Sequence, residues 1–139
     1  MKRLESIQDF NKFSESIIKE NKRYEKTITL CGGPGCHAIG AEDLRACFEQ
    51  EIKKRGLENK IRLIFSGCHG FCEQGPLAVI RPEGIFYCKI EIDDIERIIT
   101  DALIEGKIID SLLYRDEDGN KFLYEKDIPF YRSQKRILM

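Results

Sequence analysis

The sequence predicts an α/β domain with a mixed four-stranded sheet flanked by helices. The first two strand-like runs are separated by a helix-like run, which favours parallel pairing through a right-handed crossover. The next two are separated only by the turn at 82–84, which favours an antiparallel hairpin. At 139 residues and 42% hydrophobic the chain can bury one ordinary core, so we expect a single main domain.

Three segments have apolar residues at helical spacing. The first is 4–22, with Leu4, Ile7, Phe10, Phe13, Ile17 and Ile18. The second follows Gly40 and ends before Gly56, which is placed to cap its C-terminus. The third is 92–105, where Asp93 and Asp94 in the first turn suit the positive helix N-terminus.

The strand-like runs are 27–30, 61–66, the LAVI run after Pro76, and the IFYCKI run that returns from the turn. From residue 107 the character changes: LLYRDEDGNKFLY predicts a small hairpin turning at Asp118–Gly119, and IPFYRSQKRILM has no core of its own. We therefore divide the chain into an N-terminal helical extension (1–23), a core domain (24–106) and an extended C-terminal hairpin and tail (107–139).

Two tight cysteine pairs follow the first two strands directly. Cys31 and Cys36 lie in CGGPGC, and Cys68 and Cys72 lie in CHGFC. Thiolates select soft metal centres, and four of them match the ligand count of a [2Fe–2S] cluster or of a closed zinc site. The sequence thus predicts a metal site built from these two loops.

Three other interpretations of the cysteines remain open. Zinc takes the same four thiolates, although structural zinc sites favour pairs with shorter and more regular spacing. A dithiol enzyme is disfavoured because neither pair has the CxxC spacing. Disulfides are disfavoured if the chain is kept in a reducing compartment. The two remaining cysteines, Cys47 and Cys88, fall on apolar faces and are expected to act as small core residues.

The residues around the cysteines suggest a second layer of contacts. Buried sulfur charge needs hydrogen-bond donors, and glycine lets backbone N–H groups approach closely, so candidates are Gly33, Gly35 and Gly70. His37 and His69 each follow a ligand candidate and could donate to a sulfur or replace a cysteine, but solvated loop histidines are the plainer interpretation. Gly32 and Gly67 flank the same cysteines.

Several function classes are disfavoured. A net charge of −1 gives no long-range attraction to nucleic acid or anionic membranes. No run approaches the roughly 18 apolar residues of a membrane span, and the N-terminus is too polar for a signal peptide. No hydrolase triad, phosphate loop or nucleotide fingerprint occurs. We expect a cytoplasmic protein that binds no nucleic acid and inserts in no membrane.

The pattern CxxxxC in LCGGPGCHAIGA, followed by CxGxC and GPLAVIRPEGIFYCKI, resembles the thioredoxin-like [2Fe–2S] ferredoxin domain. The resemblance covers about 24–138. Within that family it is similar to the domain at the N-terminus of NADH-binding flavoprotein subunits of NAD(P)-linked, often electron-bifurcating, hydrogenases and formate dehydrogenases, which are related to a respiratory complex I subunit. In such subunits a stretch like SLLYRD and IPFYRSQKRIL leads into the flavin and NADH domain.

The resemblance implies a thioredoxin-like fold and one [2Fe–2S] cluster ligated by Cys31, Cys36, Cys68 and Cys72. It places Pro76 at the position of the proline that begins the hairpin strand, where a cis peptide bond is a possibility for a structure to check. It implies one-electron transfer to or from a flavin or NADH-binding domain and other iron–sulfur subunits. Without nucleotide sites this chain should not oxidise NADH alone, and a homodimer remains possible.

The alternative function is a non-redox assembly module, in which zinc staples the fold and the tail docks a partner. The tail is rich in the residue types that anchor interfaces, namely Phe130, Tyr131, Arg132, Lys135 and Arg136. Because the tail could dock in either case, only the metal centre separates the two functions.

Overall fold

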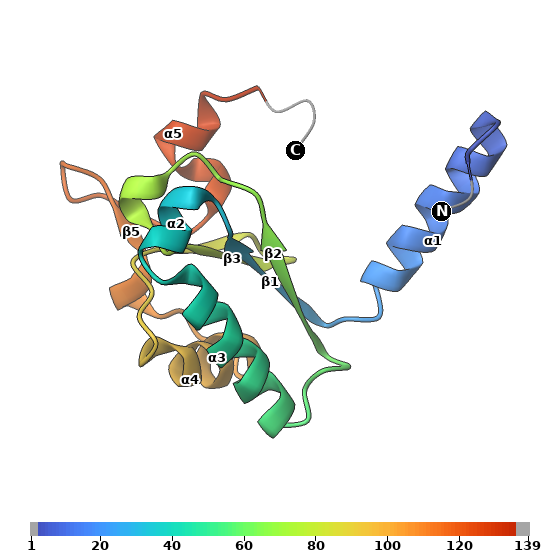
Figure 1. Cartoon of the computed structure of the whole chain (residues 1–139). Coiled ribbons are helices and arrows are strands. Elements are labelled where there is room, and N and C mark those ends of the chain that lie inside the picture. The colour runs from blue at the N-terminus through green and yellow to red at the C-terminus, as the bar shows by residue number, and fades with distance from the viewer. Residues whose placement is uncertain (1–2, 136–139) are drawn as a thin grey trace.

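A mixed four-stranded sheet forms the centre of the protein, which we describe from a computed structural model (Figure 1). The structure describes residues 3–135. The strand order is β2-β1-β3-β4. The bounds are β1 (Lys26–Cys31), β2 (Ile61–Ser66), β3 (Ala78–Arg81) and β4 (Ile85–Tyr87).

The pairing of the strands agrees with the prediction from the sequence. β1 and β2 are parallel, in a register that runs from Lys26 opposite Ile61 to Cys31 opposite Ser66. β3 is antiparallel to both β1 and β4. The Gly75–Pro76 peptide bond before β3 is cis, and so is Arg81–Pro82 in the turn that follows it. β4 is shorter than expected, and along its outer edge the Phe86 and Cys88 amides donate to the Leu123 and Leu112 carbonyls of the C-terminal segment.

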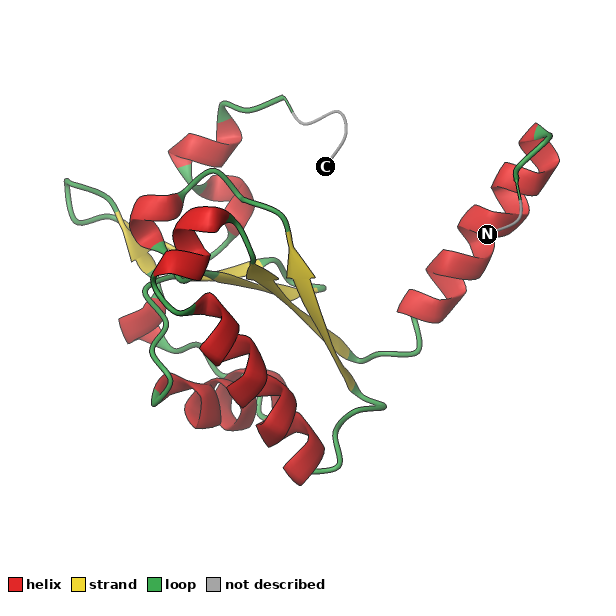
Figure 2. Cartoon of the chain, viewed as in Figure 1, coloured by secondary structure: helices red, strands yellow, loops and turns green. Residues whose placement is uncertain are grey.

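One face of the sheet is covered by helices (Figures 1 and 2). They are α3 (Ala41–Lys54), α4 (Asp94–Arg97) and the π-helical stretch η2 (Ile98–Ile104), which continues α4. The core between them includes Ile28, Leu30, Leu44, Phe48, Ile80, Tyr87, Ile95, Ile98 and Ile99. Gly56, with φ of +64°, ends α3 as expected. The third helix begins two residues later than predicted, after an exposed Ile92.

The C-terminal segment folds back on the domain: Leu112 and Leu113 pack into the main core, whereas Ile128 and Tyr131 cover the opposite face of the sheet. It contains η3 (Asp110–Leu112), the hairpin of β5 (Tyr114–Arg115) and β6 (Lys121–Phe122), η4 (Glu125–Asp127) and α5 (Pro129–Arg132). The predicted hairpin is therefore confirmed, with Gly119 at φ of +84° in its turn. Ile128 is fully buried and Tyr131 nearly so, in a second apolar cluster with Val79 and Phe86. Arg136, which the sequence also assigned to the tail, lies outside the described residues.

The N-terminal helix α1 (Ile7–Asn21) projects away from this body (Figure 1). Ser6 caps it, since its hydroxyl oxygen accepts from the Asp9 amide at 3.1 Å. None of its residues is buried, and its apolar stripe, which includes Phe10, is exposed. Among residues 3–135, no helix is both long and apolar enough to cross a membrane.

Candidate metal centre

The two cysteine loops meet because β1 and β2 are parallel neighbours. Parallel strands have their carboxyl ends at the same edge of a sheet, so the loops that follow Cys31 and Ser66 start side by side. The Gly32 amide donates to the Ser66 carbonyl at 2.8 Å and holds the loops together. A β-carbon at Gly32 would lie 2.6 Å from that carbonyl oxygen, so the contact requires glycine.

The first loop contains an element that the sequence did not predict. Pro34 starts a short helix, α2 (Pro34–Ala38), where the sequence indicated only a glycine-rich loop. Proline is favoured at the first helical position because its missing N–H has no partner there. The helix places Cys36 in the interior with no exposed surface, and Cys31 at the end of β1 is also buried.

The second loop carries the two cysteines that reach the surface. Cys68 and Cys72 are exposed, and their Sγ atoms lie 3.6 Å apart. Gly70, with φ of +79°, turns its amide toward Cys68 and donates to its Sγ at 3.2 Å. This is the backbone donor that the sequence predicted for Gly70. All six cysteines of the chain are free thiols.

The sulfurs of the two loops converge through close glycine contacts. A β-carbon at Gly33 would lie 2.7 Å from the Cβ of Cys68, and one at Gly35 would lie 3.2 Å from the Sγ of Cys72. The Cys31 thiol also lies 3.9 Å from the Gly67 carbonyl, within reach of a weak S–H···O bond. A side chain at Gly33 would thus force the loops apart, whereas one at Gly35 would only crowd the Cys72 side chain.

The thiols influence one another's ionisation. Burial, followed by interactions with the Cys31, Cys72 and Cys68 thiols, raises the pKa of Cys36 to about 12. The Gly70 N–H, assisted by a hydrogen bond with Cys72, lowers the pKa of Cys68. Its partner Cys72 has a raised pKa, because its protonated thiol shares a hydrogen bond with Cys68 and because ionised Cys68 disfavours a second negative charge beside it. Four thiols so close together ionise together only when cations compensate their charge.

The arrangement fits a binuclear iron centre. In a four-cysteine [2Fe–2S] centre each iron takes two protein ligands, so such a site needs paired sulfurs rather than three donors around one point. Such a cluster is suited by the Cys68 and Cys72 sulfurs 3.6 Å apart, by the Gly70 N–H that donates to sulfur, and by the two buried thiols of the first loop.

The remaining candidates have different surroundings. His37 is half-exposed and its Nδ1 lies 3.6 Å from a carboxylate oxygen of Glu42, so it faces α3 and solvent. His69 lies in the second loop with a buried Nδ1. Cys88 is buried, which raises the pKa of its thiol, and Cys47 packs against the main core. These positions agree with the prediction that Cys47 and Cys88 act as small core residues.

Two sets of contacts at the site were missed from the sequence. Gly75, which precedes the cis proline, approaches so closely that a β-carbon there would lie 2.9 Å from the Sγ of Cys36. Phe130 of α5 stacks on Phe71, which stands between the two cysteines of the second loop. The signal for Gly75 was the GP dipeptide after the second pair, whereas the Phe130 contact depends on where the tail folds.

The fold and the convergent thiols define a thioredoxin-fold protein with a cysteine-lined metal site. The sequence profile of the thioredoxin-like [2Fe–2S] ferredoxin family matches residues 6–103, and the chain belongs to this family. It therefore binds a [2Fe–2S] cluster and transfers electrons through it.

Individual relatives agree with this assignment. A 2Fe–2S ferredoxin from Clostridium pasteurianum is 30% identical over 77 residues, which are 55% of this chain and 76% of the relative. A protein from Priestia megaterium described as a putative 2Fe–2S ferredoxin is 24% identical over 94 residues, 66% of this chain and 73% of its own length. The structure of the thioredoxin-like [2Fe–2S] ferredoxin from Aquifex aeolicus superposes with a TM-score of 0.60 at 22% identity, over 67% of this chain and 99% of that one. At that identity the superposition shows the thioredoxin-like fold.

Proposed function

We propose that this chain passes single electrons through one [2Fe–2S] cluster ligated by Cys31, Cys36, Cys68 and Cys72, as a module of an NAD(P)H-linked flavoprotein oxidoreductase complex. The observation that carries the ligand assignment is the meeting of two buried and two exposed thiols at the carboxyl ends of β1 and β2. Neither Cys47 nor Cys88 is among these thiols.

The cysteines and the glycines around the cluster site have different roles. When bound, the cluster supplies a reversible one-electron couple. The buried thiols of Cys31 and Cys36 exclude water from one side, and the exposed pair leaves the other side open to a redox partner. The Gly70 N–H places a positive dipole on the Cys68 sulfur, and such hydrogen bonds are one determinant of cluster potentials.

The complex is proposed on the resemblance of the C-terminal region to flavoprotein subunits of hydrogenases and formate dehydrogenases. The structure adds a supporting feature, because α5 packs on the loop of Cys68 and Cys72. A flavin and NADH-binding domain or subunit next to this segment would lie near the exposed sulfurs. Other iron–sulfur subunits, or a second copy of the chain, are further partners of the same proposal.

The experiment starts from protein prepared without oxygen. It should be red-brown, contain about two irons and two acid-labile sulfides per chain, and give a paramagnetic signal after dithionite reduction. One zinc per chain without visible absorption would contradict the redox function and support the assembly module.

The second arm addresses the complex. NADH alone should leave the visible absorption unchanged, whereas NADH with the flavoprotein subunit of an NAD-linked hydrogenase or formate dehydrogenase should bleach it. A loaded cluster that no such flavoprotein reduces would contradict the proposed context but not the electron-transfer function.

A further inference from the structure

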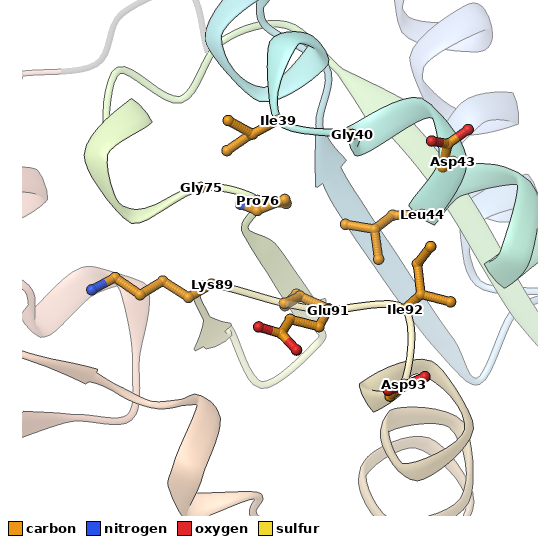
Figure 3. Close-up of a pocket in the computed structure, with 11 residues that line it drawn as sticks. Ile39, Gly40, Asp43, Leu44, Gly75, Pro76, Lys89, Glu91, Ile92 and Asp93 are labelled. Atoms are coloured by element: carbon orange, nitrogen blue, oxygen red, sulfur yellow. The ribbon is translucent and has the colours of Figure 1, made fainter.

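A groove opens beside the buried half of the metal site. It has a volume of about 570 Å³ and lies between the α2–α3 junction, the Gly75–Pro76 bond and the segment after β4 (Figure 3). Its apolar lining includes Pro76, Leu44 and Ile92. The volume suits one or two inserted side chains.

The groove is close to a proposed cluster ligand. Gly75 lines it, and a β-carbon on Gly75 would lie 2.9 Å from the Sγ of Cys36 and 3.1 Å from the Cδ1 of Ile39. Gly75 therefore contacts the groove on one side and approaches this sulfur on the other. A molecule bound in the groove would contact Gly75, which in turn lies next to the Cys36 sulfur.

The rim of the groove is negatively charged. Three carboxylates line it, from Asp43, Glu91 and Asp93, against a single ammonium group from Lys89. The Lys89 side chain extends away from the centre of the groove (Figure 3). In the part of the chain that the structure describes, none of these three carboxylates is in an ion pair, so their charge is available to a partner.

Exposed apolar side chains accompany these charges. Ile39 is 51% exposed and Ile92 is 53% exposed, on opposite sides of the groove. An apolar surface that is continuous and rimmed by polar groups is typical of a protein interaction site, and here Ile39 and Ile92 adjoin the apolar lining of the groove. The surface differs from the Phe71 and Phe130 region, so it remains free when the C-terminal segment is in place.

From this geometry we infer that the groove is a docking site for a basic electron-transfer partner, which inserts an apolar side chain flanked by Lys or Arg. Charge complementarity selects this occupant: a cationic surface is attracted to the three carboxylates, and the apolar insert fills the space between Ile39 and Ile92. The inference rests on the proposed function, because it assigns the groove as a route to the cluster through Cys36.

The dimensions suit a short-lived redox encounter. Electron-transfer interfaces are among the smallest specific protein interfaces, and complementary charge raises their association rate rather than their lifetime. A redox partner would then reach the cluster by either of two surfaces, this groove or the exposed side of Cys68 and Cys72. One protein could deliver electrons while another removes them, without displacing the first.

The test uses ferric cytochrome c, a basic redox protein, as the probe. Reduced, cluster-loaded protein is mixed with it at low ionic strength, and the second-order rate of cytochrome reduction is measured. The substitutions Asp43→Asn, Glu91→Gln and Asp93→Asn together should lower this rate about tenfold, because electrostatic steering of that order acts between charged surfaces. The difference should disappear in about 0.5 M salt, where the screening length falls to a few ångströms.

A matched control changes the net charge equally at a distance from the groove. Glu15→Gln, Glu20→Gln and Glu58→Gln remove three exposed charges on α1 and the α3–β2 loop. This control should change the rate by less than about twofold. Equal losses in the two triple variants would overturn the inference, because only net charge would then matter.

Two further measurements separate this inference from the proposed function. Iron content and visible absorption of each variant show whether the cluster is present, and their absence from the wild-type protein would contradict the proposed function itself. Amide chemical shifts of residues 43 and 91–93 are followed while cytochrome c is added to the oxidised or cluster-free protein. Binding at the groove should shift them in either form, and unchanged shifts would overturn the inference whatever the cluster does.

Discussion

The ring of Phe71 lies parallel to the ring of Phe130, with centroids 4.8 Å apart and planes inclined by 12°. Phe71 stands between Cys68 and Cys72, whereas Phe130 belongs to α5, which is outside the 6–103 region that matches the family. Tyr131 meets the same ring edge-on at 5.8 Å. The C-terminal segment therefore buttresses the loop that presents the exposed thiols.

Removing the Phe130 ring should loosen this loop. We expect Phe130→Ala to lower the free energy of unfolding by about 1–2 kcal/mol, because it removes a partly exposed stacked aromatic. Cluster loss under chelator should also become faster, as followed by visible absorption. The control is Phe10→Ala on exposed α1, which should leave both quantities unchanged; an equally stable Phe130→Ala protein would show that the stack contributes nothing.

Exchange of cysteine for serine should divide the six cysteines into two groups. Serine at Cys36 or Cys68 should abolish the cluster or grossly change its paramagnetic spectrum, because a ligand sulfur is lost. Serine at Cys47 should retain two irons per chain with an unchanged spectrum. A normal cluster in Cys36→Ser protein would disprove the ligand assignment.

The glycines of the two loops should differ sharply in their tolerance of alanine. The β-carbon of Gly33→Ala would lie 2.7 Å from Cys68 Cβ and 3.0 Å from its Cα, so the loops must separate. We expect about 1–3 kcal/mol of destabilisation from such overpacking, and at most half of the normal iron content. Gly67→Ala is the matched control, since nothing lies within 4 Å of its β-carbon. Equal iron contents in the two variants would contradict the close approach of the loops.

Thiol reactivity in the metal-free protein should follow the ionisation of the cysteines. The lowered pKa of Cys68 means more thiolate at pH 7, and this side chain is exposed, so it should react first with iodoacetamide. Cys36, which is buried and has a pKa of about 12, should react last, together with buried Cys88. Peptide mass spectrometry over time gives the order, and early labelling of Cys36 would refute the burial of that thiol.

Most of the core fold could be predicted from the sequence because its signals are local. Alternation and β-branched residues marked β1 and β2, the turn at 82–84 marked the β3–β4 hairpin, and helical spacing marked α3. Parallel pairing followed from the intervening helix. The same pairing brought the two cysteine loops together, so the convergence of the site was also predictable from the order of elements.

The features that could not be predicted depend on contacts between distant segments. Helix α2 could not be predicted because three glycines and a proline in this segment indicate a turn, and only contacts with distant residues stabilise the helical conformation here. The outer edge of β4 bonds to carbonyls of the C-terminal segment, including that of Leu112, and α5 docks on Phe71. The groove combines residues near positions 40, 75 and 90, which no local pattern relates.

The hydrogen bond from Gly32 to Ser66 has a consequence for the biogenesis of the protein. It joins residues 34 positions apart in the chain, at the end of the β1–β2 pairing, so the two thiol-bearing loops become neighbours only when these strands pair. In a nascent or heat-unfolded chain the two cysteine loops are separate, and neither loop alone has the four thiolates that hold the [2Fe–2S] cluster. We therefore expect iron and sulfide to enter a chain whose sheet has already formed, and to act afterwards as a clasp that slows its opening.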